Sequence, residues 1–183
     1  MTLTPELRDD ILKSVPSLRA FAISLTGNID QADDLVQEAI LRGLSNLHRF
    51  EPGTNIQAWL FTILRNQFHT NYRKGKREVE DPDGIMASRL SSPPEQGGRL
   101  DIQDLQSALA QLPFDQREAL LLVAAEGFSY EEAAQICGAR VGTIKSRINR
   151  ARTRLSEILG IEEAEDIGAD RITRAAIQKE EGL

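Results

Sequence analysis

Apolar residues recur every three or four positions along most of the 183-residue chain, and this spacing predicts α-helices. The helical pattern falls into an N-terminal set, within residues 1–78, and a C-terminal set over residues 100–160. Residues 79–99 contain DPDG and SSPPEQGG without sustained periodicity, which is typical of a linker. We therefore expect an all-α fold of two small helical domains joined by a flexible linker, followed by an acidic tail over residues 161–183.

The first periodic stretch, residues 5–26, is interrupted by Pro16. Proline lacks an N–H group and suits the first turn of a helix, so we expect a short helix to about Lys13 and another from Pro16 to Thr26. A further helix should begin with Asp30 as its N-cap, because a carboxylate can accept hydrogen bonds from the unpaired N–H groups at a helix start.

Residues 48–55, HRFEPGTN, should form a loop, because the Pro-Gly pair breaks a helix. The loop contains one aromatic residue, Phe50, which we expect to be exposed. Thr54 with Gln57 can cap the helix that follows. That helix has the strongest periodicity in the chain, and Trp59 lies in its apolar stripe, where tryptophan more often packs than binds a ligand.

The C-terminal set begins with a helix over residues 100–112, which ends before a proline. A second helix should run from Asp115 to Ala125, with Asp115 and Glu118 as a capping pair. The apolar residues of both helices need the hairpin at 129–155 to cover them.

Residues 129–155 predict a helix-turn-helix. Ser129 and Glu132 fit a capping box, and Gly138 can adopt the positive φ that ends a helix. The second helix has an apolar stripe formed by Ile144, Ile148, Ala151 and Leu155. Its other positions are polar, and no acidic residue occurs between Arg140 and Leu155. A basic, outward second helix is typical of the motif that enters the DNA major groove, although a basic amphipathic hairpin is also typical of a plain solvated surface.

Acidic and basic residues are concentrated in different parts of the chain, so the net charge does not describe the local charge of each surface. The formal charge is −6, yet basic residues concentrate at 65–77 and 140–154. A local field matters more for binding than the sum, so the acidic total does not exclude a nucleic-acid partner. No apolar run approaches the roughly 18 residues of a membrane span, and the N-terminus lacks a signal-peptide pattern, so we expect a cytoplasmic protein without membrane insertion.

The residue types that carry catalysis or bind metals are sparse. The single cysteine, Cys137, excludes an internal disulfide, and with only His48 and His69 it provides no zinc-ligand spacing. Its place near a helix end favours a small buried hydrophobe. With no nucleophile arrangement or phosphate loop, we expect no enzymatic activity, no metal and no cofactor.

Two further polar groups have both a functional and a structural interpretation. Asp33 and Asp34 lie in the first turn of a predicted helix, where acids stabilise the helix dipole in any protein. Residues 65–77 are basic and amide-rich with Phe68 and Tyr72 interleaved, a composition typical of nucleic-acid surfaces. Positive side chains also suit any helix C-terminus.

Two longer stretches resemble the extracytoplasmic-function sigma factors of bacterial RNA polymerase. The second conserved region of that family is similar to DQADDLVQEAILRGLSNLHRFEPGTNIQAWLFTILRN, and the fourth is similar to ALAQLPFDQREALLLVAAEGFSYEEAAQICGARVGTIKSRINRARTRL. The resemblance covers roughly residues 18–159 apart from the linker. Within the family, the chain is most similar to the general-stress-response sigma factors of alphaproteobacteria.

The resemblance implies a transcription initiation factor that binds core RNA polymerase, directs it to stress-response promoters and assists promoter opening. Residues 1–78 correspond to region 2 and residues 100–160 to region 4. The implied partners are core polymerase, promoter DNA and an anti-sigma factor, itself controlled by a response regulator with a sigma-like domain.

The resemblance also implies three sets of contact residues. The polymerase-binding set is Asp33, Asp34, Gln37, Glu38 and Arg42. The downstream-promoter set, which captures a flipped-out base and holds the opened strand, is Arg49, Phe50, Asn55, Arg65, Asn66, His69, Arg73 and Lys74. The upstream-promoter set has Thr143, Ser146 and Arg150 near base edges, with Arg140, Lys145, Arg147 and Arg154 on phosphates. Arg147 lies nearer the packed stripe than the others.

Two other functions fit parts of the pattern. A sigma-like decoy that binds an anti-sigma factor but not DNA would not need the basic face between Arg140 and Arg154. A conventional helix-turn-helix regulator with a helical sensor domain would bind duplex DNA tightly without polymerase.

Overall fold

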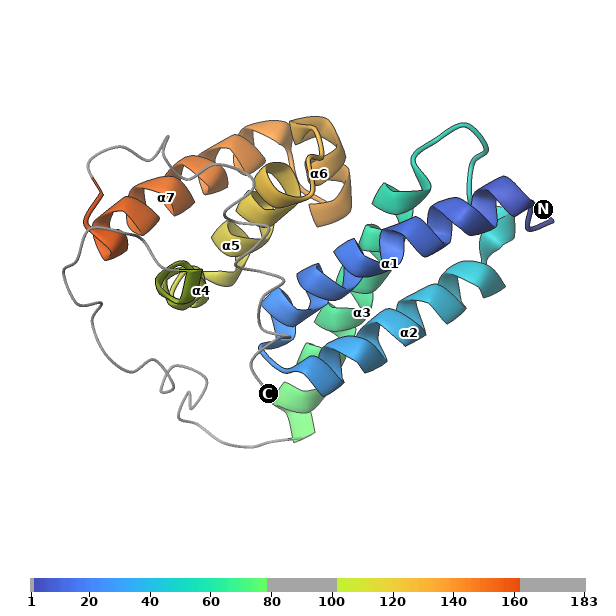
Figure 1. The fold of residues 1–183 in the computed structure, drawn as a ribbon, viewed down its shortest axis with the longest axis horizontal. Coiled ribbons are helices and arrows are strands. Elements are labelled where there is room, and N and C mark those ends of the chain that lie inside the picture. Colours follow the sequence, from blue (N-terminus) through green and yellow to red (C-terminus); the bar gives the residue numbers. More distant parts are fainter. Residues whose placement is uncertain (1, 79–101, 162–183) are drawn as a thin grey trace.

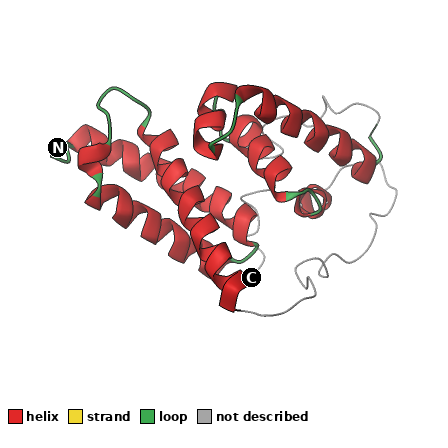
Figure 2. Ribbon diagram, turned by 180° about the vertical axis from the view of Figure 1, so that it is seen from behind, coloured by secondary structure: helices red, strands yellow, loops and turns green. Residues whose placement is uncertain are grey.

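The computed structural model describes residues 2–78 and 102–161, and every regular element in these ranges is helical (Figures 1 and 2). The all-α prediction is thereby confirmed. The predicted linker, and the tail after residue 161, lie outside the described residues. Within the described ranges, no helix is long and apolar enough to cross a membrane.

The N-terminal domain consists of α1 (Pro5–Thr26), α2 (Ile29–Ser45), the short 3-10 helix η1 (Leu47–Arg49) and α3 (Ile56–Glu78). Helices α1 and α2 lie side by side, and α3 packs across both (Figure 1). Buried apolar side chains from the three helices meet between them, with Phe21 of α1 against Phe61 of α3 at 5.1 Å between ring centroids.

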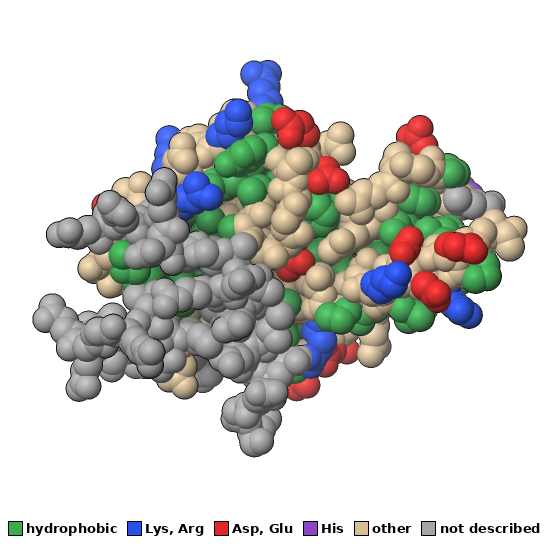
Figure 3. All heavy atoms as spheres, turned by 45° about the horizontal axis from the view of Figure 1, so that its top comes forward, with side chains coloured by type: hydrophobic (Ala, Val, Ile, Leu, Met, Phe, Trp, Pro, Cys, Tyr) green, Lys and Arg blue, Asp and Glu red, His purple; other side chains and the backbone are tan. Residues whose placement is uncertain are grey.

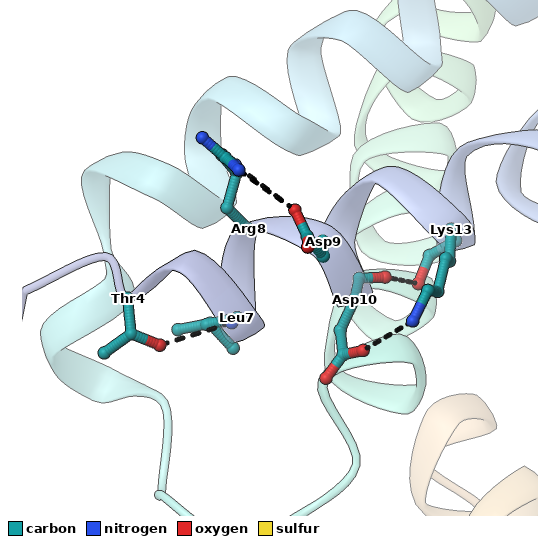
Figure 4. A network of polar contacts seen from close by, with 7 residues as sticks. Thr4, Leu7, Arg8, Asp9, Asp10 and Lys13 are labelled. Carbon is teal, nitrogen blue, oxygen red and sulfur yellow. Dashed lines mark hydrogen bonds and ion pairs between the residues drawn. The ribbon is translucent and has the colours of Figure 1, made fainter.

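Helix α1 is continuous through Pro16, so the predicted break near Lys13 is wrong. Pro16 and Leu12, whose carbonyl loses its helical N–H partner, are both exposed, so the missing hydrogen bond lies on the solvent side of the helix. At its start, Thr4 accepts a hydrogen bond from the N–H of Leu7 at 3.2 Å, and surface ion pairs follow along the helix (Figure 4).

The caps of the next two helices differ from those predicted. Asn28, not Asp30, caps α2 by accepting a hydrogen bond from the N–H of Gln31. Asn55, not Thr54, accepts hydrogen bonds from the first N–H groups of α3, at 3.0 and 3.3 Å. Thr54 instead donates to the Glu51 carbonyl within the loop.

The C-terminal domain consists of α4 (Ile102–Ala110), α5 (Phe114–Leu120), the π-helical turn η3 (Leu121–Ala125), α6 (Tyr130–Cys137) and α7 (Val141–Leu159). Helices α4, α5 and α6 all pack on α7. The Ser129–Glu132 capping box and the left-handed Gly138, at φ 60°, are confirmed. The helix-turn-helix is therefore present as predicted.

The start of α5 departs from the sequence pattern. Its N-cap position is Pro113, which provides no side-chain hydrogen bond, so the predicted Asp115–Glu118 capping pair is wrong. Glu118 is instead fully buried and faces the N-terminal domain, where it pairs with Arg65 of α3.

The two domains share one continuous apolar core, an arrangement that the sequence pattern leaves open. Phe128, between η3 and α6, lies edge-on to Phe61 of α3 at 5.1 Å between centroids. Both rings are buried, and α3 packs directly against α6. Figure 1 shows the result, in which the C-terminal domain lies along the side of α3 and α1. The domains are thus closed on each other.

Candidate nucleic-acid interface

The outer face of α7 presents the basic surface predicted for the helix-turn-helix. The buried stripe of Ile144, Ile148, Ala151 and Leu155 faces the domain core. Of the upstream-promoter set, the exposed residues are Arg140, Thr143, Lys145, Arg150 and Arg154, and Ser146 is half-buried. In Figure 3, Lys and Arg side chains project from this part of the surface. The surface has the charge and shape of a helix that enters a groove of duplex DNA.

Two cations of α7 make contacts within the domain. The ammonium of Lys145 lies 5.6 Å from the centroid of the Tyr130 ring, at the start of α6, which orients it while leaving it exposed. The side chain of Arg147 is only 23% exposed, and its guanidinium lies 3.4 Å from Oδ2 of Asp115 on α5. Arg147 therefore points toward α5 and away from the outward cations.

The face of α2 carries the five residues of the polymerase-binding set. Asp34, Gln37 and Arg42 are exposed, and Arg42 pairs with the half-buried Glu38 at 3.4 Å. Asp33 is bonded to Arg19 of α1 at 2.5 and 3.3 Å. The Arg19 hydrogen bond holds the pKa of Asp33 below its ordinary value, so this carboxylate is ionised and fixed between two helices.

The same face of α2 contains an apolar residue that the sequence pattern does not single out. Leu41 is 64% exposed and lies one turn beyond Gln37 and Glu38. Leu44, at the end of the helix, is 41% exposed. Leu41 is a candidate protein contact because it lies beside the charged residues of the predicted polymerase-binding set. The signal in the sequence is that Leu41 falls off the core-facing stripe.

The loop before α3 places its three predicted base contacts differently. Arg49 is exposed, whereas Phe50 is only 6% exposed and packs against Trp59 at 5.5 Å between centroids. The expectation of an exposed Phe50 is therefore wrong, because Trp59, on the half-buried flank of α3, covers it. Asn55 is exposed, but its Nδ2 donates to Oε1 of Glu132 in α6 at 3.0 Å.

The later part of α3 divides the remaining downstream-promoter residues into two groups. Asn66, Arg73 and Lys74 are exposed. Arg65 and His69 instead lie against α5 of the C-terminal domain. The Arg65 side chain is 14% exposed and makes two contacts with Glu118, from Nε to Oε1 and from one terminal nitrogen to Oε2 at 3.3 Å.

Burial dominates the electrostatics around this contact. It raises the pKa of Glu118 against the opposing influence of Arg65. Burial also raises the pKa of the neighbouring Cys137 thiol to about 12. The prediction of a small buried cysteine is confirmed. Burial, reinforced by the charges of Arg65 and Arg73, lowers the pKa of His69. His69 is therefore neutral at physiological pH.

Two residues of α5 belong to this interface: Glu118, which the sequence predicts as part of a helix cap, and Phe114, to which the sequence pattern assigns no role. Phe114 stacks on Phe68 of α3 with centroids 5.4 Å apart and an interplanar angle of 11°, and its ring is edge-on to His69 at 5.2 Å. Glu118 occupies a position that an apolar residue would hold, one turn before Leu122. A charged residue in an apolar stripe is the sequence signal for a buried partner.

These features define a DNA-binding protein with two helical domains. A family model described as Sigma-70 region 2 matches residues 11–78, and one described as Sigma-70, region 4 matches residues 102–155. The ECF RNA polymerase sigma factor EcfG of Rhodopseudomonas palustris is 62% identical over 177 residues, covering 97% of this chain and 98% of that protein. The ECF RNA polymerase sigma factor SigC of Mycobacterium tuberculosis is 34% identical over 134 residues, covering 73% and 72%.

Solved structures agree with these relatives. The sigma factor RpoE in complex with the anti-sigma factor NepR, from Bartonella quintana, is 49% identical with a TM-score of 0.75, covering 87% of this chain and 100% of RpoE. CnrH in complex with the cytosolic domain of CnrY is 26% identical with a TM-score of 0.55, covering 83% of each chain.

The chain belongs to the extracytoplasmic-function sigma factors of RNA polymerase, in the general-stress-response group that the sequence resemblance indicates. It is a transcription initiation factor and not an enzyme. The alternative of a conventional helix-turn-helix regulator is thereby set aside. Among the described residues, no group of three or more His, Cys, Asp or Glu side chains could hold a metal ion.

Proposed function

We propose that this sigma factor recognises stress-response promoters through one surface on each domain. Residues 100–160 read the upstream box through α7, and residues 1–78 bind core polymerase and the downstream box. The observation that carries the proposal is the outward face of α7, which is basic, exposed and free of acidic residues between Arg140 and Leu155.

On α7, the proposed base contacts are Thr143, Ser146 and Arg150, which have hydrogen-bonding side chains of the kind that read base edges in the major groove. Arg140, Lys145 and Arg154 contact phosphates, which position the helix without specifying sequence. We exclude Arg147 from this set while its guanidinium is paired with Asp115, since that pairing turns it inward.

On α3, the exposed group Asn66, Arg73 and Lys74 makes the first contacts with the opened strand, together with Arg49 in the loop before it. Arg65, His69 and Asn55 join them only when their present partners in the C-terminal domain are removed. Phe50 supports this surface from within by packing on Trp59.

On α2, the exposed Asp34, Gln37 and Arg42, with Glu38, form the proposed contact with the largest subunit of the polymerase. The Arg19–Asp33 pair fixes this face relative to α1. Polymerase holds the two domains at a fixed separation, so that two individually weak DNA contacts act bivalently.

Regulation by an anti-sigma factor completes the proposal. The relative RpoE is described in complex with the anti-sigma factor NepR. We propose that this chain, acting in the cytoplasm, binds a protein of the same kind, and that a response regulator with a sigma-like domain releases it.

The test is in vitro transcription with core polymerase on promoters that carry a GGAAC-like upstream box. The double variant Lys145→Ala, Arg150→Ala should lose most transcription, because it removes a phosphate contact and a base contact. The matched control is Arg8→Ala with Lys13→Ala, which removes two exposed cations from α1 (Figure 4).

Two outcomes would contradict the proposal. Absence of transcription by the unaltered protein from any such promoter would exclude the stress-promoter assignment. Full transcription by the double variant would show that Lys145 and Arg150 of α7 are not needed to read the upstream box.

A further inference from the structure

Helix α5 of the C-terminal domain lies on the part of α3 to which the proposed function assigns the opened promoter strand. Three of the eight downstream-promoter residues, Asn55, Arg65 and His69, contact the C-terminal domain. The partners of Arg65 and His69 are Glu118 and Phe114, which both belong to the seven-residue helix α5. In this closed arrangement, a strand and α5 cannot occupy the same surface.

Glu118 engages Arg65 as a phosphate would. Its carboxylate makes two contacts with one edge of the guanidinium, and this fork geometry is shared by arginine–carboxylate and arginine–phosphate pairs. Glu118 has no exposed surface, and Arg65 retains only 14% of its side-chain exposure. The cation is therefore withdrawn from solvent as well as paired.

Phe114 engages the aromatic side chains of α3 as a base would. Its ring lies nearly parallel to Phe68, at 11° and 5.4 Å, which is the stacked geometry used by bases on aromatic platforms. Tyr72 stacks on Phe68 in turn, at 24° and 6.2 Å, and remains 50% exposed. The platform thus continues from the covered Phe68 to an open ring beside Arg73 and Lys74.

We propose that α5 is an internal competitor of single-stranded DNA, in which Glu118 takes the place of a phosphate and Phe114 the place of a base. The free protein holds its strand-binding surface closed, and the strand binds fully only when the two domains separate. The inference rests on the proposed role of α3 in holding the opened strand.

The experiment measures binding of a short fluorescein-labelled single-stranded DNA to the free full-length protein by fluorescence anisotropy. Phe114→Ala and Glu118→Gln, singly and together, should bind the oligonucleotide more tightly, by about tenfold for the pair, since apparent affinity follows the fraction of competent protein. Asp115→Asn is the control, because it changes the charge of the same helix at an exposed position that pairs with Arg147.

A second measurement follows the domains directly and does not depend on the variants. Spin labels at Ser45→Cys in α2 and Thr153→Cys in α7, both exposed positions, report the interdomain distance. Cys137 is buried with a raised pKa, so it does not compete for the label. Adding the oligonucleotide should lengthen this distance in the otherwise unaltered protein. A bound complex that keeps the closed distance would overturn the proposal.

Failure of strand binding by α3 and failure of competition by α5 would give different results. If Arg73→Ala with Lys74→Ala does not weaken oligonucleotide binding in the Phe114→Ala background, α3 does not hold the strand and the proposed function itself is wrong. If these changes weaken binding but the α5 variants bind no better than wild type, only the competition by α5 is refuted.

Discussion

The side-chain amide of Asn55 donates a hydrogen bond to Oε1 of Glu132 across 3.0 Å, and this bond joins the cap of α3 to the capping box of α6. One carboxylate therefore serves the starts of two helices from different domains. Hydrogen bonds from the Ser129 backbone and from Asn55 hold the pKa of Glu132 below its ordinary value. Its stabilising contribution is present above that ordinary value and is lost as the pH falls through the lowered pKa.

Replacing Glu132 with Ala should lower the free energy of unfolding by about 1 kcal/mol, the usual effect of losing a helix cap. Glu131→Ala is the matched control, because Glu131 lies in the same turn and is exposed. Urea unfolding at neutral pH measures both. Equal losses in the two variants would show that Glu132 acts only through its charge near the helix start.

Glu126 gives the protein a pH dependence in the neutral range. It lies at the end of η3, hydrogen-bonded to Ser17 of α1, and burial raises its pKa from 4.5 to about 7. The folded protein therefore holds this proton more tightly than the unfolded chain. The associated stability is fully present below 4.5 and is lost as the pH rises to about 7, amounting to roughly 3 kcal/mol at most.

Glu126→Gln should remove this part of the pH dependence. The difference in unfolding free energy between variant and wild type, measured by urea titration at several pH values from about 4 to 8, isolates Glu126 because groups common to both proteins cancel. The unfolding free energy of the variant should increase relative to that of wild type as the pH rises. A difference that does not change with pH would show that the carboxyl titrates at its ordinary value.

Gly43 lies where α2 packs closely against α3. A Cβ atom added there would lie 2.9 Å from Cδ2 of Leu60, which is fully buried and has little room to move. Gly43→Ala should therefore destabilise the protein by about 1–3 kcal/mol through overpacking.

Gly75 is the opposite case on α3, since it is exposed and a Cβ there meets nothing within 4 Å. Gly75→Ala should stabilise the helix by up to about 1 kcal/mol, because alanine has the better helix propensity. Thermal unfolding of the two variants side by side tests the assignment. A stabilising Gly43→Ala would mean that α2 and α3 are less closely packed than described.

Leu41 should contribute to polymerase binding through its exposed apolar surface. Leu41→Ser should weaken binding to core polymerase by about tenfold, the effect of losing one moderate interface anchor. The thermal stability should change little, since the side chain is 64% exposed. Leu12→Ser on α1, at a position 60% exposed, is the control in the same pull-down titration. Equal effects of both would indicate non-specific loss of affinity.

The salt dependence of DNA binding should distinguish the phosphate contacts of α7 from its base contacts. Arg154→Ala removes a phosphate contact and should reduce the slope of log affinity against log salt for the promoter complex by about one. Thr143→Ala and Ser146→Ala should leave the slope unchanged and alter preference among upstream sequences. If Arg154→Ala altered sequence preference and the Thr143 and Ser146 variants reduced the salt slope, the phosphate and base assignments would have to be exchanged.

The sequence predicts the parts of the fold that depend on neighbouring residues. The stripe from Ile144 to Leu155 and the capping box at Ser129 are local patterns whose physical causes lie within one or two helical turns. The sequence does not determine which residue caps a helix when several suitable polar residues lie near its start. Asn28 and Asp30 are both good N-cap residues, and the choice between them depends on how the chain leaves α1.

The sequence does not predict which residues meet across the two domains. Glu118 and Phe114 have acceptable local roles at a helix start, and only the position of α3 shows that they contact Arg65 and Phe68. Phe50 is similar, since its burial depends on Trp59 from a neighbouring helix. The exposed cations of α7 are predictable because solvent, and not another element, surrounds them.

The contact between Phe61 and Phe128 also gives the closed arrangement a temperature dependence. Both rings are buried where the two domains meet, so separating the domains would bring apolar surface into water and raise the heat capacity. The hydrophobic part of the closing free energy therefore weakens on cooling. Cooling should therefore shift the balance toward separated domains.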